Sequence, residues 1–257
     1  MEININCDLG EKSKFHSVEN DPELLNIVNS ANVACGYHAG DEATMEMIVK
    51  ISKNNGVSIG AHPSFKDPEN FGRKRINLNS SQIKKLIIEQ YEILQSIAQK
   101  NNNEVTHIKP HGALNNMACE DLELATILAN TINEINKDLI YLVPTGSKME
   151  IAAKKLNMKI ACEIFADRNY EDDGNLVSRS KSNAIISDPE IAKKHVLEMI
   201  NSQSLNCMSG KKIPCQIDSI CIHGDNKSSL NTAKIIKKNL IENGLNLLPL
   251  NKMTKFK

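Results

Sequence analysis

The sequence lacks any apolar run approaching the ~20 residues of a membrane span, and no basic segment followed by an apolar one stands at its start. It also lacks blocks of like charge, because 31 Lys and Arg are interleaved with 31 Asp and Glu along 257 residues. A nucleic-acid partner requires a basic face, which this pattern does not provide. These absences predict a cytoplasmic protein that binds neither membranes nor nucleic acid.

Several ligand-binding motifs are missing as well. The sequence has no GxGxxG, no P-loop ending in GK[ST], and no HExxH pair, so no nucleotide site and no metal ligands are predicted from motifs. The seven cysteines follow no CxxC spacing. Their odd number and wide spread predict reduced thiols that pack as small hydrophobic residues.

The sequence does contain a regular alternation of short β-branched runs and longer amphipathic stretches, which is typical of βα units around a parallel sheet. We expect strands near 3–7, 31–35, 57–61, 106–109, 139–143, 159–163 and 218–222, with a further strand near 245–248. We expect helices near 21–29, 42–55, 80–101, 121–136, 147–156, 188–201 and 229–243. With 40% hydrophobic residues, this order favours one α/β barrel domain over 1–257 rather than two domains.

Residues at the helix boundaries and the lengths of the connections refine this prediction. Asp41, Ser80 and Ser147 are expected to be helix N-caps, and Gly56 and Gly244 are expected to end helices. Two irregular segments, 62–79 and 164–187, are longer than ordinary connections and are expected to form lids or walls of a site. Segment 202–217 is expected to be a plain surface connection.

Ionisable side chains follow nearly every expected strand. The carboxyl ends of the strands converge on one face of a parallel barrel, and active sites are built there. A single histidine after a strand more often has a structural role. Several ionisable residues at the strand ends on one face are not explained well by structural roles alone. The candidates for catalysis are Asp8, His38, His62, Lys109, His111, Glu163 and His223.

Two segments offer ways to stabilise developing negative charge. Gly36 and Gly40 flank His38 just before a helix, where backbone N–H groups can hold an anion or an oxyanion. Lys109 ends an otherwise apolar strand, where a lysine is costly to bury without a partner. Both are candidates for binding the reacting group of a substrate.

Further candidates for substrate binding lie in the loops. Arg168 can bind a carboxylate through two N–H groups, and Arg73 in the first irregular segment can do the same. Asp167 either forms an ion pair with Arg168 that holds the loop, or is part of the site. Asp225, two residues after the last histidine, either tunes that histidine or caps the next helix.

Taken together, these segments resemble the LamB/YcsF family, whose members form the A subunit of prokaryotic 5-oxoprolinase. The resemblance covers nearly the whole chain in order, at 6–11, 31–41, 59–63, 71–73, 109–114, 165–170, 176–179 and 220–225. The chain departs from the usual residues of the family at 12–15, 63–65 and 115, which affects loop shape and substrate fit but leaves the ionisable groups in place.

The resemblance implies a seven-stranded, TIM-like barrel of the glycoside hydrolase/deacetylase type. It also implies a hydrolase that opens 5-oxo-L-proline to L-glutamate, with ATP as cosubstrate, together with separate B and C subunits. In that division of labour, B and C activate the lactam by phosphorylation with ATP, and this chain completes ring opening.

For C–N hydrolysis of an activated lactam, the roles remain open among the candidates. A cation such as Arg73 or Arg168 would bind the substrate carboxylate, while Lys109 and the 36–40 loop stabilise charge on the ring carbonyl. The base for water would be Asp8, His38 or Glu163, and the acid for the leaving nitrogen would be His62, His111 or His223.

Two other functions are compatible with the sequence. One is a metal-dependent deacetylase or amidohydrolase, in which Asp8, His38 and His62 bind Zn²⁺ and leave a position for water. The other is a small-molecule binding subunit that holds a ligand without catalysis.

Overall fold

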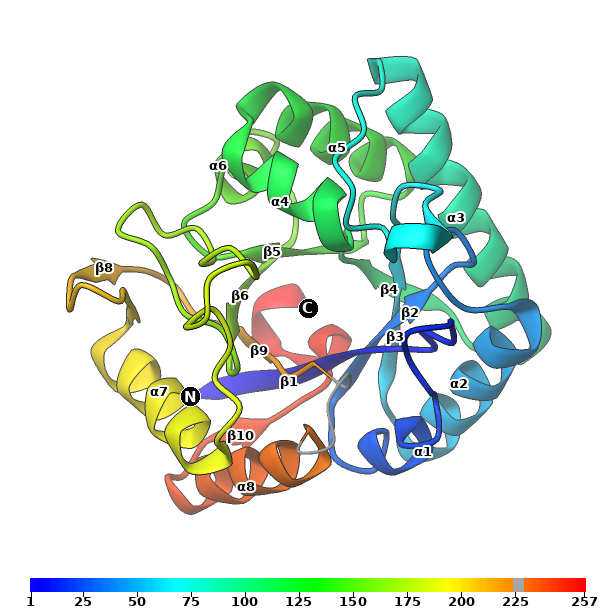
Figure 1. Cartoon of the computed structure of the whole chain (residues 1–257). Coiled ribbons are helices and arrows are strands. Elements are labelled where there is room, and N and C mark those ends of the chain that lie inside the picture. The colour runs from blue at the N-terminus through cyan, green and yellow to red at the C-terminus, as the bar shows by residue number, and fades with distance from the viewer. Residues whose placement is uncertain (224–228) are drawn as a thin grey trace.

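Seven parallel strands close into a ring in the computed structural model, which describes residues 1–223 and 229–257 (Figure 1). In order around the ring they are β1 (Glu2–Leu9), β2 (Ser30–Ala34), β3 (Ser58–His62), β4 (Val105–Ile108), β5 (Ile140–Pro144), β6 (Ile160–Phe165) and β9 (Ser219–Cys221). Strand β1 pairs with β2 on one side and with β9 on the other, which closes the barrel. The seven strands lie within two residues of their predicted positions, and the TIM-like barrel is confirmed.

Helices surround this ring (Figure 1). They are α1 (Asp21–Leu24), α2 (Glu42–Asn55), α3 (Ser80–Lys100), α4 (Gly112–Glu120), α5 (Leu122–Ile135), α6 (Lys148–Lys155), α7 (Pro189–Ser202) and α8 (Ser229–Glu242). The predicted helix at 21–29 was too long, because the chain leaves α1 through a turn and must enter β2 at Ser30. Helix α4 was not predicted, since it follows the end of β4 almost directly and begins at Gly112, whose φ of 56° is left-handed.

Capping residues explain where the long helices begin. Asp41 and Ser147 are N-caps as predicted, and each accepts a backbone N–H with its side chain. The predicted N-cap at Ser80 is wrong by one residue. Asn79 holds that position, and its side chain forms a reciprocal capping box with Gln82.

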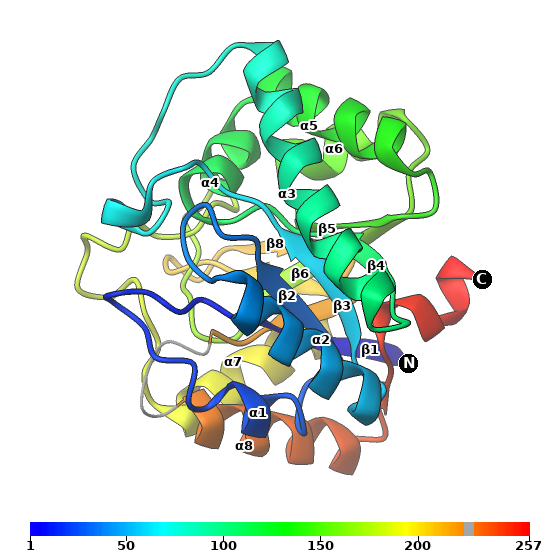
Figure 2. The ribbon, with the colours of Figure 1, turned by 90° about the vertical axis from the view of Figure 1, so that its right-hand side faces the viewer.

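The remaining elements lie outside the ring. Strand β10 (Asn246–Leu247) pairs with the start of β1, as the further predicted strand suggested. Strands β7 (Ser204–Asn206) and β8 (Lys212–Pro214) form an antiparallel hairpin, so segment 202–217 is not a plain connection. Leu250, Met253 and Phe256 pack against the barrel strands at the end where both termini lie, opposite the long loops (Figure 2).

The interior of the barrel is polar. Asn4, Asn6 and Asp8 alternate along β1 and point inward, because strand side chains alternate between the two faces. Asn4 donates to Ser30 Oγ at 2.9 Å, and Asn6 donates to Glu163 Oε1 at 2.8 Å across the barrel. Pairing of this kind offsets the cost of burying polar groups and fixes the side chains beneath the site.

One glycine makes room for this interior network. A Cβ on Gly60 would lie 2.1 Å from His107 Cδ2, and His107 is held by Asn32 Oδ1 at 3.0 Å. We therefore expect Gly60→Ala to lower the free energy of unfolding by about 3 kcal/mol, measured by urea denaturation. Gly210→Ala is the control, because nothing lies within 4 Å of its Cβ position, although its φ of 90° adds a cost of about 1 kcal/mol. Equal losses in the two variants would contradict the expectation.

Candidate active site

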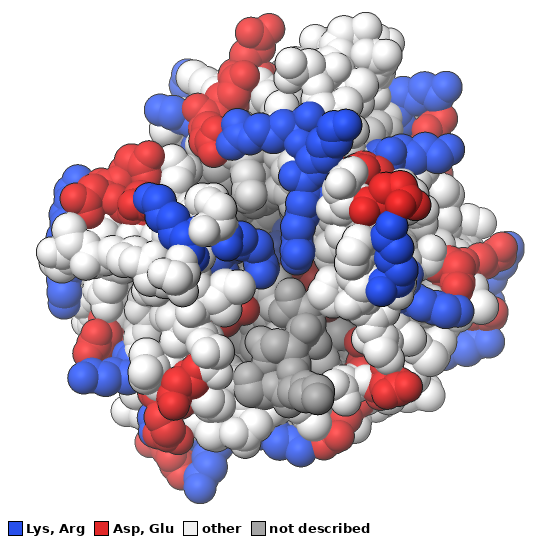
Figure 3. Space-filling model, viewed as in Figure 1, with Lys and Arg blue, Asp and Glu red and all other residues white. Residues whose placement is uncertain are grey.

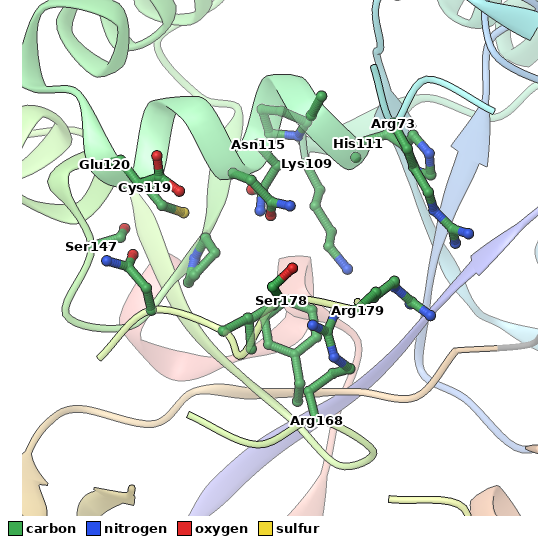
Figure 4. A pocket seen from close by; sticks show the side chains of 18 of the residues that line it. Arg73, Lys109, His111, Asn115, Cys119, Glu120, Ser147, Arg168, Ser178 and Arg179 are labelled. Carbon is green, nitrogen blue, oxygen red and sulfur yellow. The ribbon is translucent and has the colours of Figure 1, made fainter. Parts of the chain in front are cut away.

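A cavity of about 350 Å³ opens at the carboxyl ends of the barrel strands. Both irregular segments that were expected to form lids or walls line it, with Arg73 from the first and residues 174–179 from the second. Lys and Arg side chains border the central hollow of this face (Figure 3), and several of them point into the pocket from different sides (Figure 4). The cavity is therefore suited to an anionic ligand.

Lys109 forms the centre of the buried part of the pocket. Its Nζ lies 3.0 Å from Asp8 Oδ1 and 3.1 Å from Glu163 Oε1, and it donates to Cys221 Sγ at 3.1 Å. Burial alone would lower the pKa of Lys109, but the charge of Asp8 and the neighbouring Cys221 and Glu163 outweigh it and raise this pKa well above its usual range. The lysine is a fixed positive charge that two carboxylates share.

Asp8 stands at the carboxyl end of β1 and lines the cavity. Its Oδ1 accepts from Asn32 Nδ2 at 2.8 Å as well as from Lys109, while Oδ2 lies 3.4 Å from His62 Nε2. Burial opposes ionisation, yet the charges of His62 and Lys109 hold the pKa of Asp8 well below its usual range. Asp8 is therefore an ionised carboxylate that faces the ligand space.

Glu163 lies deeper than Asp8. It is fully buried, it does not line the cavity, and its Oε1 is bound by both Asn6 and Lys109. Burial raises the pKa of Glu163, although the charge of Lys109 acts in the opposite sense. Its position fits a role in holding the lysine rather than one in contact with a ligand.

Three histidines and a glutamate converge beside Asp8. Glu11 Oε1 lies 3.1 Å from His38 Nε2, 3.2 Å from His111 Nδ1 and 3.8 Å from His62 Nε2. The rings of His38 and His111 are stacked with centroids 3.9 Å apart. Burial lowers the pKa of His38 to about 3 and also lowers that of His111. These four side chains can hold a metal ion.

A histidine and a carboxylate form a pair at the end of the barrel next to β9 and β6. His223 Nδ1 lies 2.8 Å from Asp167 Oδ2, and the imidazole stacks on Phe165 with centroids 5.7 Å apart. Burial would raise the pKa of Asp167, but the charge of His223 outweighs it and lowers this pKa. A carboxylate in this position orients an imidazole and stabilises its protonated form.

Arg168 both holds its loop and lines the cavity. Its Nε donates to Ala184 O at 3.2 Å and its Nη2 donates to Val177 O at 2.6 Å. Burial lowers the pKa of Arg168 to about 10, and the neighbouring charge of Arg179 acts in the same sense. Arg73 is exposed, and its guanidinium lies 5.0 Å from the ring of Phe71.

The predicted site residues thus divide by position. Those that line the cavity are Asp8, His62, Arg73, Lys109, His111, Arg168 and His223. His38, Glu163 and Asp167 lie behind them and contact them. Asp225 lies outside the described residues.

Gly36 and Gly40 do not offer the free N–H groups expected of them. Gly36 N–H donates to Ala39 O and Gly40 N–H donates to Lys12 O, both at 2.9 Å. Neither glycine lines the cavity. Their left-handed φ values of 86° and 83° instead shape the turn that places His38.

Sequence reasoning missed two residues at the centre of the site. Glu11 entered only as part of the resemblance, yet it contacts three histidines. Cys221 was treated as packing, but its sulfur accepts from Lys109. The signal for Glu11 was available, because a carboxylate follows the turn at Gly10, directly after the strand that carries Asp8.

Asp21 fixes the turn that presents Glu11. Its Oδ2 accepts from Gly10 N–H at 2.7 Å, and burial raises the pKa of Asp21 to about 7. Because this pKa is raised on folding, the folded state binds a proton that the unfolded chain has released, and stability falls as the pH rises from about 4 to about 7. Between pH 5 and pH 8 the free energy of unfolding of the native chain should fall by about 2 kcal/mol because of Asp21, and this fall should be absent in Asp21→Asn.

Urea denaturation at the two pH values checks this expectation. Asp41→Asn serves as the control, because the hydroxyl of Thr44 lowers the pKa of Asp41 to about 2, outside this pH range. An unchanged pH dependence in Asp21→Asn would contradict the expectation.

Among the described residues, no helix is both long and apolar enough to cross a membrane.

Comparisons with known proteins agree with this geometry. The LamB/YcsF family matches residues 3–255. A protein of Clostridium beijerinckii that is named as the A subunit of 5-oxoprolinase is 43% identical over 251 residues, which cover 98% of each chain. The crystal structure of the lactam utilization protein from Thermus thermophilus superposes with a TM-score of 0.88 at 30% identity, covering 96% of this chain and 99% of that one.

A more distant likeness concerns the fold alone. A peptidoglycan N-acetylglucosamine deacetylase superposes with a TM-score of 0.50 at 15% identity, over 98% of this chain and 87% of that one. The expected deacetylase-type barrel is thereby confirmed.

Proposed function

The chain belongs to the LamB/YcsF family, and from this premise we propose that it is the A subunit of a 5-oxoprolinase. In this proposal it hydrolyses the C–N bond of 5-oxo-L-proline to give L-glutamate, together with B and C subunits. The sequence contains no P-loop, so the proposal assigns ATP to the partner subunits, which activate the lactam before this chain opens it.

The observation that carries the proposal is Lys109, held between Asp8 and Glu163 beneath a cavity lined by cations. An amide carbonyl accumulates negative charge on its oxygen when water adds to the carbon. A buried ammonium stabilises that charge strongly, because little water screens it. Lys109 is placed to act on the ring carbonyl in this way.

Asp8 is the base that best fits the positions of the candidates. It is ionised and lines the cavity, whereas His38 and Glu163 do not line it. Asp8 takes a proton from water as the water oxygen bonds to the carbonyl carbon of the ring. The ring C–N bond then breaks, and its electron pair stays with nitrogen.

His223 is the candidate acid for that nitrogen. The pair with Asp167 stabilises the imidazolium that must donate the proton. His223 lines the cavity beside Asp8, with a ring nitrogen within 4.8 Å of an Asp8 carboxylate oxygen. Proton transfer from His223 frees the amino group, while the former ring carbonyl carbon is left as an acyl phosphate. A second water then hydrolyses this acyl phosphate to the side-chain carboxylate of L-glutamate and inorganic phosphate. The base and the acid are then reset by exchange with solvent.

Arg73 is proposed to bind the α-carboxylate of the substrate. It lines the cavity from an exposed loop, while Arg168 uses two N–H groups to hold backbone carbonyls. We expect Arg73→Gln to raise KM for 5-oxo-L-proline about 10- to 100-fold with a smaller effect on kcat, since a charged hydrogen bond contributes about 1.5–3 kcal/mol. Lys74→Gln is the control, because Lys74 is exposed in the same loop and does not line the cavity. A change in kcat alone would contradict this role.

Reconstitution tests the function directly. The purified chain is mixed with the B and C subunits of 5-oxoprolinase, ATP and 5-oxo-L-proline, and glutamate is measured with each component omitted in turn. Glutamate release that requires all components supports the proposal. No release, or release that continues without this chain, would sink it, and acetate release from N-acetylated sugars by the chain alone would point to a deacetylase instead.

A further inference from the structure

The four side chains Glu11, His38, His62 and His111 offer ligand atoms that all lie within 4.8 Å of one another. They come from four separate segments: the turn after β1, the loop after β2, the end of β3 and the start of α4. Three of these side chains, Glu11, His62 and His111, also line the cavity. The cluster is therefore built by the fold and lies within reach of a solute.

Hydrogen bonds determine which ring nitrogens carry protons. His62 Nδ1 lies 2.7 Å from Lys109 O, and His111 Nε2 lies 2.9 Å from Phe71 O. A carbonyl oxygen can only accept, so both of these ring nitrogens are N–H donors. In the neutral rings, His62 Nε2 and His111 Nδ1 then carry lone pairs, and these two atoms face each other at 3.0 Å.

Two lone pairs at that distance repel unless a positive centre lies between or beside them. Glu11 Oε1, 3.2 Å from His111 Nδ1, directs further negative charge at the same point. His38 Nε2 lies 3.1 Å from Glu11 Oε1, while His38 Nδ1 has no hydrogen-bond partner among the described residues. Without a cation, His38 Nε2 donates to Glu11 Oε1, whereas a cation bound at both of these atoms moves the ring N–H to Nδ1 and leaves the lone pair on Nε2.

The distances fit a tetrahedral cation site. Four ligands about 2.0–2.1 Å from a central ion lie about 3.3 Å from one another. The three separations from Glu11 and the one between His62 and His111 run from 3.0 Å to 3.8 Å, and those between His38 and the other two histidines are within 4.8 Å. Backbone carbonyls that accept the outer N–H groups of His62 and His111 are also the usual partners of metal-binding histidines.

We propose that Glu11, His38, His62 and His111 bind one divalent transition-metal ion with the ligand preference of zinc. Imidazole nitrogens with a single carboxylate suit zinc and its neighbours in the first transition row, whereas magnesium and calcium require more oxygen ligands. This ligand set differs from the Asp8, His38 and His62 set that the sequence left open. Asp8 lies beside the site instead, with Oδ2 at 3.4 Å from His62 Nε2.

Metal binding can be measured on the full chain without substrate or partner subunits, so failure of the proposed function would leave this result unaffected. The chain is dialysed against a chelator, equilibrated with Zn²⁺ or Co²⁺, and separated from free metal by gel filtration. We expect about one ion per chain by elemental analysis, and the visible absorption bands of tetrahedral Co²⁺. Glu11→Gln and His38→Asn should each weaken binding at least about 100-fold.

His195→Asn is the matched control, because His195 lies on α7, outside the cluster, and should leave binding unchanged. Circular dichroism of each metal-free variant verifies its fold, and Glu11→Gln, which changes a partly exposed side chain, keeps the test valid if His38→Asn does not fold. Metal content near zero in the native chain would overturn the proposal. So would equal metal content in Glu11→Gln and the control, or an NMR spectrum in which a proton on His111 Nδ1 persists unchanged when Zn²⁺ is added.

Discussion

Replacing Lys109 by methionine should reduce kcat/KM for glutamate release by about 10³-fold or more in the reconstituted enzyme. Methionine keeps much of the volume but removes the charge that lies 3.0 Å from Asp8 and 3.1 Å from Glu163. The variant should also lose about 3–5 kcal/mol of stability, because two buried carboxylates are left without their common partner. Initial rates and urea denaturation measure the two effects separately.

A second substitution separates catalysis from stability. In Lys109→Met with Glu163→Gln, the neutral amide oxygen of residue 163 can still accept from Asn6, so most of the lost stability should return while activity stays absent. Lys255→Met is the matched control, because Lys255 binds buried Asp218 at the opposite end of the barrel. Recovery of activity along with stability in the double variant would show that Lys109 has only a structural role.

The strands and the convergence of their ends were within reach of the sequence. Short β-branched runs indicate the strand positions, and a parallel barrel then requires the ends of β1, β3 and β4 to meet. For this reason the sequence alone points to Asp8, His62 and Lys109 together. In the structure, Asp8 lies 3.4 Å from His62 Nε2 and 3.0 Å from Lys109 Nζ. Periodicity and topology were sufficient for this part of the site.

The contacts that set the chemistry were not predictable in the same way. Glu11 reaches the histidines because Gly10 adopts a left-handed φ of 72° and its N–H is held by Asp21. The glycine is a local signal for the turn, but the contact with Asp21 has no local signature. The 36–40 loop looked like a source of free N–H groups. The N–H groups of Gly36 and Gly40 donate to Ala39 O and Lys12 O, and which carbonyls meet a loop depends on tertiary structure. The tautomers of His62 and His111 likewise depend on distant carbonyls.

Asp8→Asn should remove catalysis with little effect on the fold. The amide oxygen of asparagine can accept from Asn32 and Lys109 as Asp8 Oδ1 does, so the hydrogen bonds at 2.8 Å and 3.0 Å are kept. The variant cannot take a proton from water, and a general base contributes about 10²- to 10⁴-fold to the rate. We expect kcat to fall by about 10³-fold, with KM changed less than about threefold, in steady-state measurements of glutamate release.

The matched control for this substitution is Asp218→Asn. Asp218 is also a buried aspartate with a lysine partner, and it accepts from Cys162 N–H at 2.8 Å, but it precedes β9 at the amino end of the barrel. Asp218→Asn should lose stability and keep its kcat, whereas Asp8→Asn should keep its stability and lose kcat. If Asp8→Asn retains most of its kcat, the proton must be taken by another group that faces the cavity, and the assignment of the base to Asp8 fails while Lys109 can still act on the carbonyl.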